Sequence, residues 1–195
     1  MNKTIAWPAI CALALSIGAC GGGGGGDEKA APAAATANAA GAKPAAAPSF
    51  DFAAWVAANA DCKGEYFSDV QEPAFAQTLR DAGVTVSAES SIGEVGPGGG
   101  TLTPGRPIRL HGLPVRRVDY DFGSGSTFAV VVDASAEQAR AAIDAKPLPE
   151  IYREYYSLGV ATAPPSEDVP MPDIQFVRAG EQKGTQEIGC AAFDM

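Results

Sequence analysis

The chain has 195 residues, and 14 lysines and arginines against 23 aspartates and glutamates give it a formal net charge of −9. Nucleic acid is therefore excluded as an expected partner, because so acidic a chain would be repelled by a phosphate backbone. Its single histidine, His111, excludes a metal site built from several histidines. No motif points to a cofactor, and we expect neither a cofactor nor a metal ion.

The first residues have the layout of an export signal. Lys3 supplies a positive charge, residues 5–17 are mostly apolar, and small residues follow them. Pro8 interrupts the apolar run, which is shorter than the roughly 20 residues that a membrane-spanning helix requires. We therefore expect residues 1–19 to be a signal peptide that is removed.

The four residues Ile17, Gly18, Ala19 and Cys20 resemble the lipobox of bacterial lipoproteins, which has a branched aliphatic residue, two small residues and a cysteine. The resemblance implies that Cys20 receives a diacylglycerol, that the leader is cut before it and that the new amino terminus is acylated. Two or more acyl chains hold a protein durably on a membrane. Gly21 stands where an aspartate commonly marks retention in the inner membrane, so the resemblance favours the outer membrane, facing the periplasm.

The count of cysteines agrees with lipid attachment. Removal of the leader would discard Cys11 and leave Cys20, Cys62 and Cys190, an odd number for an exported chain. If Cys20 carries lipid, Cys62 and Cys190 remain as one pair, and we predict a disulfide between them in an oxidising compartment. The alternative is an ordinary secretory leader, cut nearby, that leaves Cys20 as a free thiol. No Cys-x-x-Cys spacing indicates a redox role.

Residues 20–48 are predicted to be a lipidated, disordered tether. Six consecutive glycines are followed by a tract rich in alanine and proline, with almost no large apolar side chain to bury. Residues 49–195 have a length typical of one domain with a hydrophobic core of its own.

Apolar residues at helical spacing predict a first helix from about Phe52 to Cys62 and a second from Glu72 to Gly83. Residues 87–107 are rich in glycine, serine and proline, and we expect a long mobile loop there. The glycine run within it is not a phosphate-binding loop, because neither a helix nor a Lys-Ser/Thr pair follows.

The clearest strand signal lies in residues 108–110, 115–122 and 127–133. Apolar and charged residues alternate along the second of these segments, and Gly-Ser-Gly follows it, so we predict a hairpin at the centre of an antiparallel sheet. Asp119 and Asp121 fall on its polar face together with Arg117.

This pair of carboxylates admits two functional interpretations, a catalytic pair and a calcium site. Asp119 and Asp121 supply fewer oxygen ligands than a calcium loop needs. We therefore interpret them as part of a solvated face, paired with Arg117.

Ser135 and Gln138 have the spacing of a capping box and predict a helix that lies across the sheet. Residues 150–158 are predicted to be a further helical piece, with Tyr152, Tyr155 and Tyr156 at helical spacing. These tyrosines are a candidate exposed patch for a partner, because tyrosine is enriched at interfaces. Packing in the core is the commoner alternative for such a stripe.

An irregular stretch, residues 163–172, precedes two final strands at 174–178 and 186–192, and Cys190 lies on the last of them. The pattern predicts an α+β domain. We expect a mainly antiparallel sheet of about four to five strands, with helices on one face and one disulfide.

No catalytic residue is assigned. His111 precedes a glycine in an expected turn, and no Gly-x-Ser-x-Gly elbow occurs. A glycosidase-like pair of carboxylates remains open, because such pairs are assembled in space. We expect a membrane-anchored envelope lipoprotein whose periplasmic domain is a non-enzymatic binding or accessory module, with an envelope protein as its partner. The alternative is a periplasmic enzyme or enzyme inhibitor that acts on cell-wall material or an envelope protease.

Overall fold

The computed structural model describes residues 50–94 and 96–193. The expected signal peptide, lipid attachment at Cys20 and tether lie outside these residues. No helix within them is long and apolar enough to cross a membrane. The elements, in chain order, are α1 (Phe52–Ala60), α2 (Tyr66–Gln71), α3 (Phe75–Asp81), β1 (Val84–Val86), β2 (Gly98–Pro104), β3 (Arg109–Leu110), β4 (Leu113–Gly123), β5 (Gly125–Asp133), α4 (Ala136–Ala142), β6 (Lys146–Pro147), the 3-10 helix η1 (Glu150–Tyr152), β7 (Leu158–Ala161), β8 (Ile174–Ala179) and β9 (Thr185–Ala192).

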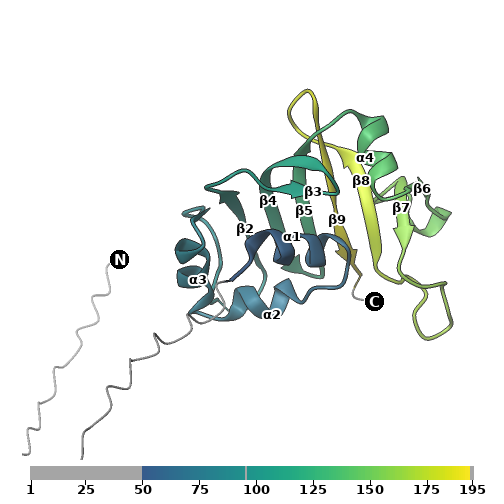
Figure 1. The fold of residues 1–195 in the computed structure, drawn as a ribbon. Helices are drawn as coiled ribbons and strands as arrows, with labels where there is room; N and C mark the ends of the chain where they lie inside the picture. The colour runs from purple at the N-terminus through teal and green to yellow at the C-terminus, as the bar shows by residue number, and fades with distance from the viewer. Residues whose placement is uncertain (1–49, 95, 194–195) are drawn as a thin grey trace, which may run out of the picture. The chain divides into compact units, whose positions relative to one another are not determined.

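Within the described part of the chain, one sheet holds nine strands (Figure 1). Eight of them follow the order β1-β2-β4-β5-β9-β8-β7-β6, β3 pairs with β4, and every pairing is antiparallel. The predicted α+β class and antiparallel sheet are confirmed, but the expected count of four to five strands is too low. Strands β1, β3, β6 and β7 have only two to four residues, too few for alternation to reveal them.

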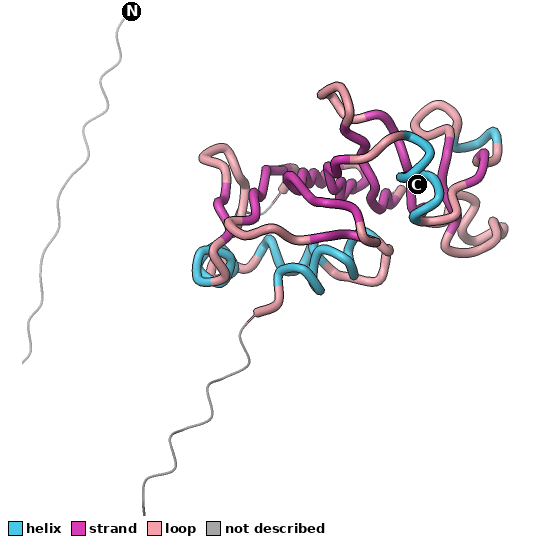
Figure 2. Tube along the Cα trace, turned by 45° about the horizontal axis from the view of Figure 1, so that its top comes forward, coloured by secondary structure: helices cyan, strands magenta, loops and turns pink. Residues whose placement is uncertain are grey.

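The predicted hairpin is confirmed as β4 and β5, whose antiparallel pairing continues to the Gly123–Gly125 pair at the hairpin tip. One face of this hairpin is apolar and is covered by α1 and α2, while α3 packs beside β1 on the same face of the sheet (Figures 1 and 2). Phe128 of β5 lies at the centre of this core and is fully buried. Its ring contacts those of Trp55 at 5.3 Å and Tyr66 at 5.0 Å between centroids.

The expectation of a long loop at residues 87–107 is wrong for Gly98–Pro104, which form β2 between β1 and β4, whereas the described residues on either side have no helix or strand. The glycines allow this strand to approach its neighbours closely. A Cβ on Gly99 would lie 2.6 Å from the carbonyl oxygen of Tyr120, and one on Gly100 would lie 2.6 Å from the hydroxyl of Ser90. Low β propensity concealed a strand in which glycine is required for packing.

The predicted capping box is confirmed: Ser135 and Gln138 hydrogen-bond to each other's backbone amides at the start of α4. The first helix is confirmed as α1, and the second as the shorter α3, whereas α2 was not expected.

The predicted helix at residues 150–158 is wrong, because only η1 forms there and Leu158 already begins β7. Pairing of β7 with β8 draws the chain into the sheet before a second helical turn can form.

A second, smaller core lies on the other face of the sheet and is centred on β8 and β9. It is formed by Ala129, Leu148, Tyr152, Tyr156, Ile174, Phe176 and Ala191. The predicted disulfide is confirmed: Cys62 after the end of α1 is bonded to Cys190 of β9. Toward β4 and β2, the second face changes from apolar to charged, and the candidate site begins at this boundary.

Candidate binding site

The three candidate tyrosines do not share one exposed face. Tyr152 is fully buried and donates a hydrogen bond to the carbonyl oxygen of Pro172 at 2.9 Å, and Tyr156 is only 8% exposed. Tyr155, between them, is 59% exposed. The turn that replaces the expected helix thus sends two rings into the second core and leaves one on the surface.

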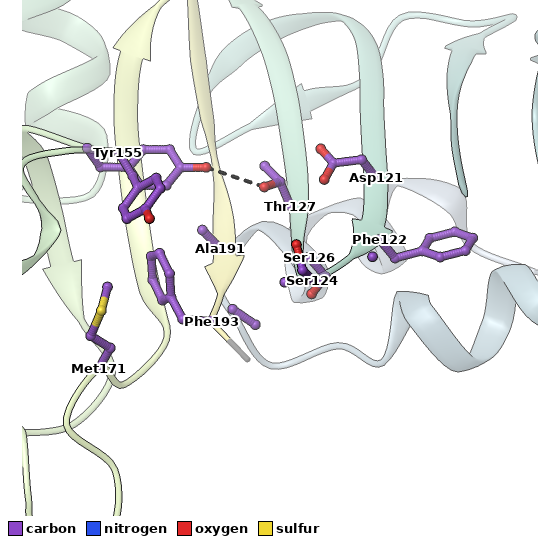
Figure 3. A pocket seen from close by; sticks show the side chains of 13 residues that line it. Asp121, Phe122, Ser124, Ser126, Thr127, Tyr155, Met171, Ala191 and Phe193 are labelled. Carbon is purple, nitrogen blue, oxygen red and sulfur yellow. Dashed lines mark hydrogen bonds between the residues drawn. The ribbon is translucent and has the colours of Figure 1, made fainter. Parts of the chain in front are cut away.

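Tyr155 borders a hollow of about 480 Å³ at the end of the β4–β5 hairpin. Its walls come from segments far apart in the sequence: the hairpin tip, the turn that carries Tyr155, the residues just before β8 and the end of β9 (Figure 3). The volume lies within the range of roughly 300–1,000 Å³ that is usual for binding pockets. We call this space the hairpin hollow.

One half of the hairpin hollow is apolar and consists of Tyr155, Phe193 and Met171, which Figure 3 shows on the side away from the hairpin. The ring of Phe193 lies 6.0 Å from that of Tyr155 and 5.6 Å from that of the buried Tyr152, between centroids. The exposed Tyr155 therefore lies beside a ring that packs onto the second core.

The other half is polar and belongs to the hairpin, with Asp121, Ser124, Ser126 and Thr127 on its wall. The hydroxyl of Tyr156 lies 3.3 Å from that of Thr127, at hydrogen-bonding distance, and joins the two halves (Figure 3). The carboxylate of Asp121, by contrast, makes no hydrogen bond or ion pair within the described part of the chain. Burial raises the pKa of Asp121, and the positive charge of Arg178 only partly opposes that effect.

Arg178 is held by another partner. Its Nε donates to Oε2 of the buried Glu187 at 2.6 Å, and its guanidinium lies 5.6 Å from the ring centre of Tyr156 and 5.2 Å from that of Phe176. Burial lowers the pKa of Arg178, but the hydrogen bond with Glu187 and nearby negative charges raise it further than burial lowers it. The arginine is thus fixed on the sheet, and Asp121 keeps a free carboxylate.

Asp121 also borders a second hollow, of about 680 Å³, on the charged part of the same face. There Asp119 accepts hydrogen bonds from Arg117 and Thr101, each at 2.8 Å, and Arg117 also pairs with Glu181 at 3.1 Å. The interpretation of this face as paired with Arg117 is confirmed for Asp119 but not for Asp121. The two aspartates are therefore unequal, one neutralised by its neighbours and the other unpaired.

His111 lies in the predicted turn, between β3 and β4, with a backbone φ of 49°. Its Nε2 is 3.0 Å from Oδ1 of Asp61, which also accepts a 2.7 Å hydrogen bond from Gln175. The group borders a hollow of about 580 Å³, but the cysteine there, Cys62, has its sulfur in the disulfide. The contacts join the end of α1, the β3–β4 turn and β8, as expected for a structural clamp.

No group of three or more histidine, cysteine, aspartate or glutamate side chains within residues 50–94 and 96–193 is arranged to hold a metal ion. Comparison with protein-family models, with curated proteins and with solved structures finds no match for the chain.

The sequence indicates Tyr155 as a candidate, but it indicates neither Phe193 and Met171 nor the unpaired carboxylate of Asp121. Phe193 follows the last predicted strand, and an aromatic residue there could have indicated a wall at the strand end. Met171 lies in the irregular stretch 163–172, where no periodicity orients it. The free carboxylate of Asp121 had no sequence signal, because Asp119 and Asp121 occupy equivalent positions in the alternating pattern.

Proposed function

We propose that the chain is a membrane-anchored envelope lipoprotein whose domain is a non-enzymatic binding module, and that it contacts an envelope protein at the hairpin hollow. The observation that carries the proposal is the exposure of Tyr155 beside Phe193 in that hollow. A large aromatic ring that is kept in water adds little to the core but supplies contact area to a partner, and tyrosine is enriched at such contacts.

The anchor part of the proposal rests on the lipobox-like residues that end at Cys20. A lipid on Cys20 would place the domain on a membrane, and Gly21 favours the outer membrane, facing the periplasm. Metabolic labelling with palmitate tests this part. We expect labelling of the native chain and none of the Cys20→Ser variant, and continued labelling of that variant would contradict the anchor.

Site-specific photocrosslinking in the intact envelope tests the binding part. A photoreactive phenylalanine analogue replaces Tyr155 in one chain and Ile151 in a matched control. Ile151 is 46% exposed on the same short segment but does not border the hairpin hollow. We expect a discrete adduct from position 155 and none from position 151. Equal adducts at both positions, or none at 155, would contradict the proposal.

A second candidate function, an enzyme or enzyme inhibitor acting on cell-wall material or an envelope protease, is favoured by one observation. His111 and Asp61 face a hollow, as a proton-transfer pair would. The hydroxyl of Thr162 borders the same space but donates to the carbonyl oxygen of Asp173 at 2.9 Å. Release of peptidoglycan fragments by the purified chain, lost in His111→Gln, would favour this candidate over binding alone.

A further inference from the structure

We infer that the hairpin hollow recognises a basic side chain, lysine or arginine, that neighbours an apolar residue in a segment of a partner protein. The inference rests on the proposed function and specifies the chemistry of its ligand. Asp121 would receive the cation, while Tyr155 and Phe193 would contact the apolar neighbour and the aliphatic stem of the basic residue.

The first support is the state of Asp121. Its carboxylate borders the hairpin hollow, is exposed to an incoming ligand and has no ion pair in the described residues, and neighbouring atoms shield it enough from water to raise its pKa. Loss of water makes a negative charge costly, and a cation from outside can offset that cost. The nearby Arg178 offsets only part of that cost, and its Nε is bonded to Glu187 at 2.6 Å.

The second support is the combination of groups in one hollow. An aromatic surface attracts a cation through its negative face, and a carboxylate attracts it through charge. Tyr155 and Phe193 stand on one side and Asp121 on the other, as Figure 3 shows. An amphipathic side chain with an apolar stem and a charged head suits these two walls better than a purely apolar ligand, which would cover Asp121 without offering it a partner.

The third support is the charge of the whole chain, which is −9. A field of that sign speeds the approach of basic segments and repels acidic proteins and anionic lipid surfaces. A second copy of the same chain is disfavoured as an occupant for the same reason. Charge complementarity therefore selects a basic segment of another protein.

The test is a calorimetric titration of the full chain in detergent with capped hexapeptides. The probe has the sequence Gly-Gly-Phe-Lys-Gly-Gly, and its matched controls carry glutamine or glutamate in place of lysine. We expect the lysine peptide to bind about two to five times more tightly than the glutamine peptide, as an ion pair with an exposed carboxylate implies. The glutamate peptide should bind most weakly.

Two Asp→Asn variants separate a local contact from general charge. Asp121→Asn should abolish the preference for lysine over glutamine, and it breaks no bond of the described fold. Asp168→Asn removes the same charge from an exposed residue outside the hairpin hollow and should leave the preference intact. Equal effects of the two variants, or equal affinity of the lysine and glutamine peptides, would overturn the inference.

A third variant distinguishes failure of the inference from failure of the proposed function. Tyr155→Ala should weaken the lysine and glutamine peptides alike, because both lose the aromatic contact. If it does so while lysine has no advantage, the inference fails and binding at the hollow stands. If no peptide binds, or if ethanolamine, a small amine without a peptide backbone, binds as tightly as the lysine peptide, a basic peptide is not the ligand. Crosslinking at position 155 then tests the proposed function independently.

Discussion

On the face covered by α1–α3, β4 contributes the buried Val118 and Tyr120, whereas on the opposite face the same strand contributes Arg117 and Asp121. The covered face buries nearly all of its large side chains. The opposite face buries them only near β8 and β9 and then opens into two hollows that meet at Asp121. Alternation along a strand thus lets one sheet hold a core on one side and present ligand-binding groups on the other.

The largest expected effect comes from breaking the covered face. Phe128→Ala removes a fully buried ring between Trp55 and Tyr66, and we expect it to lower the free energy of unfolding by about 3–5 kcal/mol. The matched control is Phe67→Ala, whose ring is 48% exposed. Denaturant unfolding of both variants measures the difference. Similar losses in the two variants would show that the core is not centred on Phe128.

The next effect concerns the link between the helices and the sheet. Replacement of both Cys62 and Cys190 with serine releases a loop with a sequence separation of 128. We expect a loss of stability of about 2–4 kcal/mol, because the unfolded chain gains conformational freedom. Thermal unfolding under non-reducing conditions measures it. A melting temperature unaffected by the double substitution would contradict a stabilising role for the disulfide.

A smaller effect is expected at the boundary between the core and the charged part of the second face. Glu187→Gln removes the charge that holds Arg178, and we expect it to cost about 1–2 kcal/mol, since the side chain is nearly buried. The freed Arg178 would then compete for Asp121 and weaken binding of the lysine peptide. Unfolding and peptide titration of this variant measure the two effects, and unchanged peptide affinity would show that Arg178 does not reach Asp121.

The smallest expected effect is the pH-dependent contribution of Asp121 to stability. Burial raises its pKa in the folded chain, so its contribution to stability is fully present below the pKa of the unfolded chain and is lost as the pH rises through the folded pKa. Asp121→Asn should therefore stabilise the chain at neutral pH, by less than about 1 kcal/mol because the carboxylate is partly exposed. The gain should vanish near pH 2.5, where the carboxyl is protonated in both states. A variant less stable than the native chain at neutral pH would contradict the absence of a partner.

Local chemistry explains which parts of the fold could be predicted from the sequence. The capping box at Ser135 and the alternation in β4 depend on neighbours in the chain, and the Cys62–Cys190 bond follows from counting cysteines. Strand β2 could not be predicted in this way, because its glycines are explained only by the closeness of β4 and of Ser90 and Ser91, which precede the strand. Residues 150–158 have helical spacing, but pairing of β7 in the sheet overrides it.

The candidate site was predictable only in part, for the same reason. Tyr155 was identified within a stripe of three tyrosines, but its exposure depends on the turn that separates it from Tyr152 and Tyr156. Asp119 and Asp121 look alike in the sequence. They differ because Thr101, on the neighbouring strand, and Arg117 both bond to Asp119 and leave Asp121 free.

The central claim is that the hairpin hollow binds a partner while the covered face only holds the fold together. Amide chemical-shift mapping of the isotopically labelled full chain, during titration with the lysine hexapeptide, would locate the binding surface. We expect the shift changes to fall at residues 121–127, 155–156 and 191–193 and the amides of α1–α3 to stay unchanged. Shifts centred on the helices, or spread evenly over the described residues, would contradict it.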